Sequence, residues 1–199
     1  MNIEFQLNKM SFMVCIISLM LLTNNLQGQD KYEKESRIDV KEVPAKALKQ
    51  VEILFGQESN LKWFIEESDK GTSYEAKLKY NGLRHSVEFS EEGTLQDIEI
   101  ESGWKDLNAE AKENIEEYFE DNYQKTKVKR MQIQLSGDFE DILEALEEKD
   151  YTEADVRYEI EYLGTKNNRS QLWEGLFDDE GEHLQSKKII LPPTVNLDF

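Results

Sequence analysis

Hydrophobic residues recur along this chain with two different periods, one typical of helices and one typical of strands. Three segments have helical spacing, and their expected apolar faces are Val43, Ala47, Leu48, Val51, Leu54 and Phe55, then Leu107, Ala111, Ile115, Tyr118 and Phe119, then Phe139, Ile142, Leu143 and Leu146. Pro44 suits a helix start and Gly56 a helix end, and Asn108 is a plausible N-cap. Five positions of the first two faces match at a constant offset of 64 residues, which indicates a duplicated unit.

Strand-like alternation follows each of the first two helices. It predicts strands around 61–66, 74–80, 87–89 and 95–100, and again around 131–135, 156–162, 173–177 and 184–190. Asn81-Gly82 is a strong hairpin signal, because both turn positions need a positive φ.

The order of these elements predicts an α+β fold of two tandem repeats. Each repeat would be a helix followed by a four-stranded antiparallel meander, with the helix packed on the apolar face of its sheet. The first repeat would span 42–102. The second would span 103–191, with a helical insertion at 137–149.

The two ends of the chain differ in composition from the rest. Residues 11–23 form a short apolar run after Lys9, which is typical of a secretory signal peptide over 1–28, with an uncleaved anchor as the alternative. Residues 29–41 are highly charged and indicate a flexible leader, and 192–199 would be a tail. The single cysteine, Cys15, lies in the apolar run, so the exported protein would contain no thiol. We therefore expect a periplasmic or secreted protein with no stable membrane anchor after cleavage.

Charge and side-chain chemistry exclude several classes of function. The chain has 42 Asp and Glu against 24 Lys and Arg, a net charge of −18, which argues against nucleic-acid binding. The two histidines, His85 and His183, lack zinc-site spacing, and no nucleophile motif or glycine-rich phosphate loop is present. We therefore expect no catalysis, no cofactor and no metal site.

Part of the first half resembles a known group of exported proteins. The helix start Val43-Pro44-Ala45, the segments 61–63 and 74–82, and the segment 87–93 with its Glu91-Glu92-Gly93 turn resemble the PepSY-like repeats of exported Bacteroidetes proteins, which are similar in fold to the β-lactamase-inhibitor protein. The resemblance is good over about 40–101 and weaker over 104–190. It implies a non-catalytic, exported binding module, and it transfers no functional residue.

The face of the sheet opposite the apolar set is the expected binding surface. It combines charged side chains with a few apolar anchors, and the candidate binding residues are Phe64, Lys77, Lys79, Arg84, Leu172 and Leu176. The negative field predicts a basic protein or peptide as the partner, and inhibition of that partner is left open. The alternatives are a structural or envelope-stress protein without a specific ligand, and a weak metal-responsive module. The sequence leaves the oligomeric state open.

Overall fold

The computed structural model describes residues 30–31, 33–57, 60–68, 71–151 and 154–190. Within these ranges ten strands form one sheet, in the order β1-β10-β9-β8-β7-β6-β5-β4-β3-β2. The strands are β1 (Asp30–Lys31), β2 (Glu33–Ile38), β3 (Lys62–Ser68), β4 (Gly71–Tyr80), β5 (Leu83–Ser90), β6 (Leu95–Glu101), β7 (Lys125–Ser136), β8 (Asp155–Lys166), β9 (Arg169–Phe177) and β10 (His183–Ile189). All neighbouring strands are antiparallel except the two-residue β1, which pairs parallel with β10.

The predicted fold of two tandem helix-and-meander repeats is wrong, because the strands of both halves belong to one continuous sheet. The strands β6 and β7 pair directly, with Ile98 opposite Leu135 and Ile100 opposite Ile133. Both pairs place apolar side chains on the same face, so separating the halves would expose that face to water. The free strand edge that a separate meander would leave is thereby removed.

Part of the expected flexible leader lies in the sheet. Residues Glu33–Ile38 form β2 and pair with β3 from Glu33–Ser68 to Ile38–Trp63. Ile38 packs against the core, and Lys34 Nζ lies 2.9 Å from Glu67 Oε2 across the strand pair. The high charge of this segment therefore belongs to an edge strand. The signal peptide predicted over 1–28 and the tail over 192–199 fall outside the described residues.

In the part of the chain that the structure describes, three α-helices cover one face of the sheet, and a short 3-10 helix precedes the first of them. They are η1 (Val40–Glu42), α2 (Ala45–Phe55), α3 (Ala109–Asn122) and α4 (Phe139–Glu148). The buried residues are Ala47, Val51, Leu54 and Phe55 in α2, Ala111, Ile115 and Phe119 in α3, and Ile142 and Ala145 in α4. All of them except Ala145 lie on the predicted helix faces. The side chain of Asn108 accepts a hydrogen bond from the Ala111 N–H at 2.7 Å, so it is the N-cap of α3.

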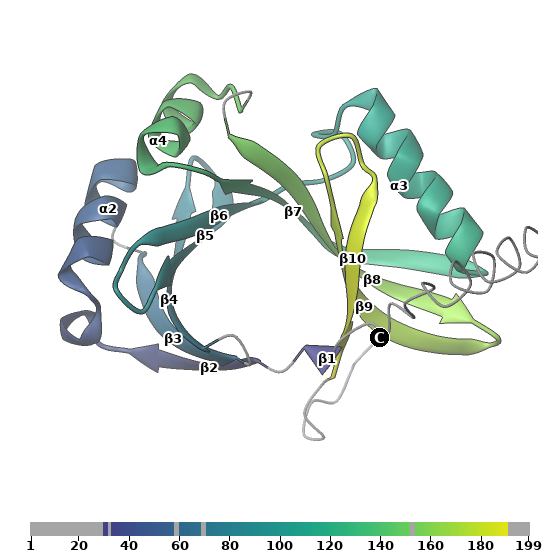
Figure 1. The fold of residues 1–199 in the computed structure, drawn as a ribbon, viewed down its shortest axis with the longest axis horizontal. Helices are drawn as coiled ribbons and strands as arrows, with labels where there is room; N and C mark the ends of the chain where they lie inside the picture. The colour runs from purple at the N-terminus through teal and green to yellow at the C-terminus, as the bar shows by residue number, and fades with distance from the viewer. Residues whose placement is uncertain (1–29, 32, 58–59, 69–70, 152–153, 191–199) are drawn as a thin grey trace, which may run out of the picture.

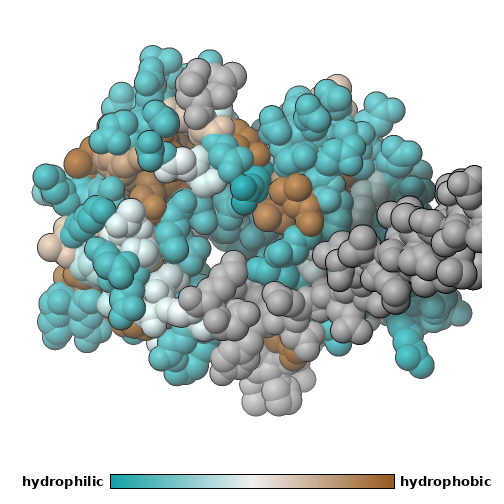
Figure 2. All heavy atoms as spheres, viewed as in Figure 1, coloured by the Kyte–Doolittle hydropathy of each residue, from teal (hydrophilic) through white to brown (hydrophobic). Residues whose placement is uncertain are grey.

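The sheet is strongly curved, and the helices lie on its outer, convex side (Figure 1). The hydrophobic core lies between the helices and this convex face, where Phe89, Ile98, Ile160, Tyr162 and Phe177 are fully buried. The concave face looks inward, towards the opening in the middle of Figure 1. Hydrophilic residues cover most of the described surface in the same view, with hydrophobic residues showing in places between the helices (Figure 2).

Candidate functional site

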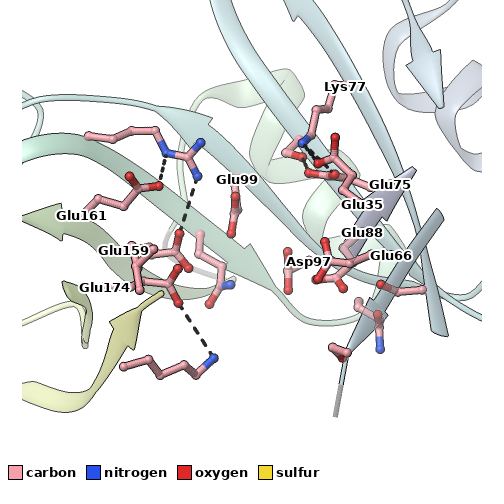
Figure 3. Close-up of a pocket in the computed structure, with 18 of the residues that line it drawn as sticks. Glu35, Glu66, Glu75, Lys77, Glu88, Asp97, Glu99, Glu159, Glu161 and Glu174 are labelled. Carbon is pink, nitrogen blue, oxygen red and sulfur yellow. Dashed lines mark hydrogen bonds and ion pairs between the residues drawn. The ribbon is translucent and has the colours of Figure 1, made fainter. Parts of the chain in front are cut away.

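The concave face of the sheet carries the candidate site, a cavity of about 620 Å³. Side chains from nearly every strand line it, with nine carboxylates against three cations. The carboxylates are Glu35, Glu66, Glu75, Glu88, Asp97, Glu99, Glu159, Glu161 and Glu174, and the cations are Lys77, Arg130 and Lys187. Figure 3 shows the carboxylates pointing into one hollow from both halves of the sheet. The cavity therefore concentrates negative charge where the sheet curves around it.

Strand alternation explains why so many carboxylates meet on this face. Buried residues of β4, β5 and β6 alternate with residues that face the concave side. They include Ala76 and Leu78, then His85, Val87 and Phe89, then Ile98 and Ile100. The register then places Glu75 directly opposite Glu88, and Glu88 directly opposite Asp97. Like charges directly opposite each other destabilise a sheet. This row is therefore an unfavourable arrangement that the apolar face must offset.

The first of the three cations, Lys77, lies between two carboxylates. Its Nζ is ion-paired with Glu35 of the edge strand β2 and lies 2.9 Å from Glu75 Oε2. The same Nζ lies 5.0 Å from the centroid of the Phe64 ring, within the range of a cation–π contact. Lys77 therefore ties β2 to the floor of the cavity.

Burial and charge act in opposite directions on the two side chains of this pair. Burial raises the pKa of Glu75, the neighbouring charge of Glu35 adds to the rise, and the hydrogen bond from Ser86 and the Lys77 ammonium reduce it. Burial alone would lower the pKa of Lys77, but its hydrogen bonds and charge interactions with Glu35 and Glu75 outweigh burial and raise that pKa.

The other two cations lie in the second half of the sheet. Arg130 Nε is 3.1 Å from Glu161 Oε1, and its Nη2 is 3.9 Å from Glu159 Oε1. Lys187 Nζ is 3.8 Å from Glu174 Oε1. Glu159 and Glu174 are only 9% and 7% exposed, so these two carboxylates are buried in the wall of the cavity. Such buried charges need partners, and they hold Arg130 and Lys187 in place.

The six predicted binding residues divide between the lining of the cavity and its surroundings. Lys77 and Leu172 line the cavity. The register places Phe64 opposite Glu75 and Leu176 opposite Glu159, so both share the concave face. Lys79 and Arg84 are exposed and directly opposite each other near the β4–β5 turn, outside the lining.

Sequence reasoning missed the carboxylates, although the signal was present. The alternation that predicts Ala76 and Leu78 as core residues also predicts Glu75 and Lys77 on the other face. Alternation does not specify the register across the ten strands, because that register depends on contacts between residues far apart in the sequence. Glu99 shows this, because its Oε2 accepts a hydrogen bond at 2.8 Å from Gln132 Nε2 of β7.

Both histidines lie away from the cavity, on the helix side of the sheet. His85 is buried, contacts the rings of Phe55 and Tyr80, and lies 3.3 Å from the Leu83 carbonyl oxygen through its Nδ1. His183 stacks on Tyr118 with 4.1 Å between ring centroids. Burial lowers the pKa of both imidazoles. Across the described ranges, no three His, Cys, Asp or Glu side chains are arranged to hold a metal ion.

Comparison with solved structures identifies proteins with the same fold. A candidate periplasmic protein of Bacteroides eggerthii is similar to this chain with a TM-score of 0.50 and 16% identity, over 73% of this chain and 88% of that chain. A DUF2874 family protein of Bacteroides ovatus is similar with a TM-score of 0.51 and 11% identity, over the same shares of the two chains. The chain shares its fold with these two Bacteroides proteins.

A BLIP-like protein of Bacteroides fragilis also matches, with 15% identity over 77% of this chain and 92% of that chain. Its TM-score of 0.49 is too low to relate the two folds. No protein-family model matches the chain, and no curated protein matches its sequence. The resemblance to PepSY-like repeats therefore stays a prediction. None of the helices in the described ranges has the length and hydrophobicity needed to cross a bilayer.

Proposed function

We propose that this chain is an exported, non-catalytic binding module whose concave sheet face docks a cationic segment of a protein or peptide. The observation that carries the proposal is the composition of the cavity, where nine carboxylates face three cations. A concave surface lined by one sign of charge focuses the field and attracts the opposite charge. The shared fold with a candidate periplasmic protein and the apolar run at 11–23 support export.

The bound segment would replace repulsion between carboxylates with attraction. Glu75, Glu88 and Asp97 follow one another across three strands, so a lysine or arginine above this row would meet several carboxylates at once. Phe64 and Leu172 offer apolar contacts on the same face for the aliphatic part of such a side chain. Docking would involve no covalent step.

A lysine-rich decapeptide tests this proposal by calorimetry at low and high salt. The native protein should bind it at low salt and lose affinity as salt screens the charges. The triple variant Glu66→Gln, Glu88→Gln, Asp97→Asn should bind about tenfold more weakly, because several exposed ion pairs of modest strength are lost together. Its fold should persist, because the substitutions relieve opposed like charges.

A matched control removes three carboxylates from the exposed face of α3. Glu113→Gln, Glu117→Gln, Glu120→Gln changes the net charge by the same amount and leaves the cavity intact. Its affinity should stay within about twofold of the native value, because charges beyond the Debye length are largely screened. Equal losses in both triple variants would show that only net charge attracts the peptide, and the docking proposal would then fail.

A further inference from the structure

The two sides of the cavity differ in charge. The strands β2 to β6 contribute six of the nine carboxylates and only one of the three cations, Lys77. The strands β7 to β10 contribute the other three carboxylates and the other two cations, Arg130 and Lys187. Most of the negative charge of the cavity therefore comes from the first side. We name this side the acidic wall, defined as Glu35, Glu66, Glu75, Glu88, Asp97 and Glu99 with Lys77.

The charges of the second side form a row across four strands. Arg130 of β7 lies opposite Glu161 of β8, and Glu161 lies opposite Glu174 of β9. Glu174 in turn lies opposite Lys187 of β10. The row contains two cations and two carboxylates, so it is neutral as a whole. A positively charged ligand would gain much less here than at the acidic wall.

All three large hydrophobic residues that line the cavity come from this second side. They are Leu172 in β9, Ile189 at the end of β10, and Ile190, and we name them the apolar patch. Trp173 lies opposite Lys188 and packs against the core, so Leu172 and Ile189, one position further along each strand, face the concave side. Leu163 of β8 lies opposite Leu172 and extends this surface.

The apolar patch is separate from the hydrophobic core. Among the described residues, the partly buried hydrophobic side chains that pack against the core include Trp173 but neither Leu172 nor Ile189. Ile190 is 54% exposed, one of the highest values among the large hydrophobic residues of the described ranges. Apolar area left in contact with water is unfavourable, and an apolar side chain of a partner would remove it from water.

The acidic wall and the apolar patch are close enough for one short segment to contact both. β1 pairs with β10 and β2 pairs with β3, and Lys31 and Glu33 are only two positions apart in the chain, so the two ends of the sheet approach each other (Figure 1). Figure 3 shows Glu88 and Glu174 on opposite sides of the hollow. Leu172 in β9 and Glu88 in β5 are four strands apart, at most about 19 Å along the sheet. About six extended residues span this distance.

We infer that the docked segment is amphipathic, with its lysine or arginine side chains at the acidic wall and one or two large aliphatic side chains on the apolar patch. The inference rests on the proposed function and adds the chemical class and the orientation of the segment. Two differences between the sides carry it, because the excess of carboxylates lies on one side and the apolar lining on the other. A segment with basic residues alone would leave the apolar patch in water.

Two decapeptides of equal charge test the inference by calorimetry with the whole exported chain. Both have lysine at positions 1–4, and one has leucine at positions 8 and 10 where the other has serine, with serine at the remaining positions of both. The native protein should bind the leucine peptide about tenfold more tightly than the serine peptide, and part of this preference should persist at high salt, which does not screen apolar contacts. A preference below about twofold would overturn the inference and leave the proposed function intact, whereas no binding of either peptide would overturn both.

Variants of the apolar patch test where the preference arises. Leu172→Ser, Ile189→Ser, Ile190→Ser should reduce the tenfold preference to about twofold or less, and Ile190→Ser alone, at an exposed position that puts little of the fold at risk, should reduce it about twofold. The matched control Val40→Ser, Ile53→Ser, Leu83→Ser removes three exposed hydrophobic side chains outside the cavity and should keep the preference. An unchanged preference in both patch variants would overturn the inference.

The chain's own segment 191–199 and a second copy of the chain are the competing occupants of the apolar patch. Val195→Ser, Leu197→Ser, Phe199→Ser removes apolar side chains from the segment that follows Ile190 and should leave the affinity for the leucine peptide unchanged. A rise of more than about threefold would assign the patch to this segment and overturn the inference. A dimer in sedimentation experiments that the patch triple variant abolishes would assign the patch to a second copy, with the same consequence.

Discussion

The two faces of this sheet differ in how their side chains affect the stability of the fold. On the convex face, alternate residues such as Phe89, Ile98 and Phe177 are fully buried under helices. On the concave face, the residues between them place carboxylates directly opposite carboxylates, as in the Glu75–Glu88 pair. Burial of apolar area supplies the stability, which leaves the other face free to hold charges that disfavour folding. The comparison indicates that the charged residues of the concave face add little to the stability of the fold.

Neighbouring residues of β9 test this difference most strongly. Phe177 is fully buried and touches Tyr118, Phe119 and His183, so Phe177→Ala should reduce the free energy of unfolding by about 3–5 kcal/mol. Leu176, the residue before it, faces the concave side and is half-buried, so Leu176→Ala should cost about 1 kcal/mol or less. Urea unfolding of both variants measures the two losses. Similar losses of unfolding free energy in the two variants would show that both faces contribute equally to stability.

Two turn glycines test how closely the helices are held to the convex side. Gly181 has φ +85°, and a Cβ there would lie 2.3 Å from the Ala111 carbonyl oxygen in α3. Gly82 has φ +86°, and a Cβ there would meet nothing within 4 Å. Gly82→Ala should cost about 1–2 kcal/mol from the left-handed backbone alone.

Gly181→Ala adds a backbone collision to the same conformational cost, so α3 or the turn must shift. Its loss should exceed that of Gly82→Ala by at least about 1 kcal/mol, as measured by thermal unfolding. Asn114 Nδ2 donates to the Glu180 carbonyl oxygen at 2.9 Å, so the same turn is also held by a hydrogen bond to the helix. Equal losses in the two variants would show that α3 is free to move away from the turn.

The sequence predicts the convex face better than it predicts the concave one. Helical spacing identified Ala47, Val51, Ala111 and Ile115, because one helix buries its own stripe whatever the rest of the chain does. Strand alternation similarly identified the buried residues Ala76, Leu78, Val87 and Phe89 of β4 and β5, but it did not identify the buried His85. Local sequence patterns are therefore sufficient to predict the positions that burial determines.

Local sequence patterns predict neither the pairing of the two halves into one sheet nor the composition of the cavity. Pairing of β6 with β7 brings Glu99 beside Gln134, 35 residues later in the chain, and alternation alone does not specify that register. Two apolar-faced meanders side by side and one continuous sheet have the same sequence pattern. A highly charged edge strand such as β2 likewise resembles a flexible segment, because edge strands are protected by charge.

Acidification should change the stability contributions of the two faces in opposite directions. The test residue on the convex face is His85. Burial lowers the pKa of His85, so the unfolded chain binds its proton more readily than the folded protein does. The contribution of His85 to stability is therefore fully present above about pH 6.5, the unfolded value, and is lost as the pH falls below it. His85→Phe should flatten this loss in urea titrations between pH 7 and 5. An unchanged slope would show that the imidazole is protonated without cost.

Glu75 represents the concave face, and its pH dependence has the opposite sign. Its pKa is raised above 4.5 by burial, so the folded protein binds the proton more readily, and the free energy of unfolding should fall as the pH rises through that raised value. Glu75→Gln removes the titrating group and should make stability less sensitive to pH just above 4.5, where Ser86 and Lys77 partly offset the effect of burial on the pKa of Glu75. Glu113→Gln, on the exposed face of α3, controls for the loss of one carboxylate. A steeper slope in Glu75→Gln would mean that Lys77 outweighs burial, and the concave row would then stabilise the fold.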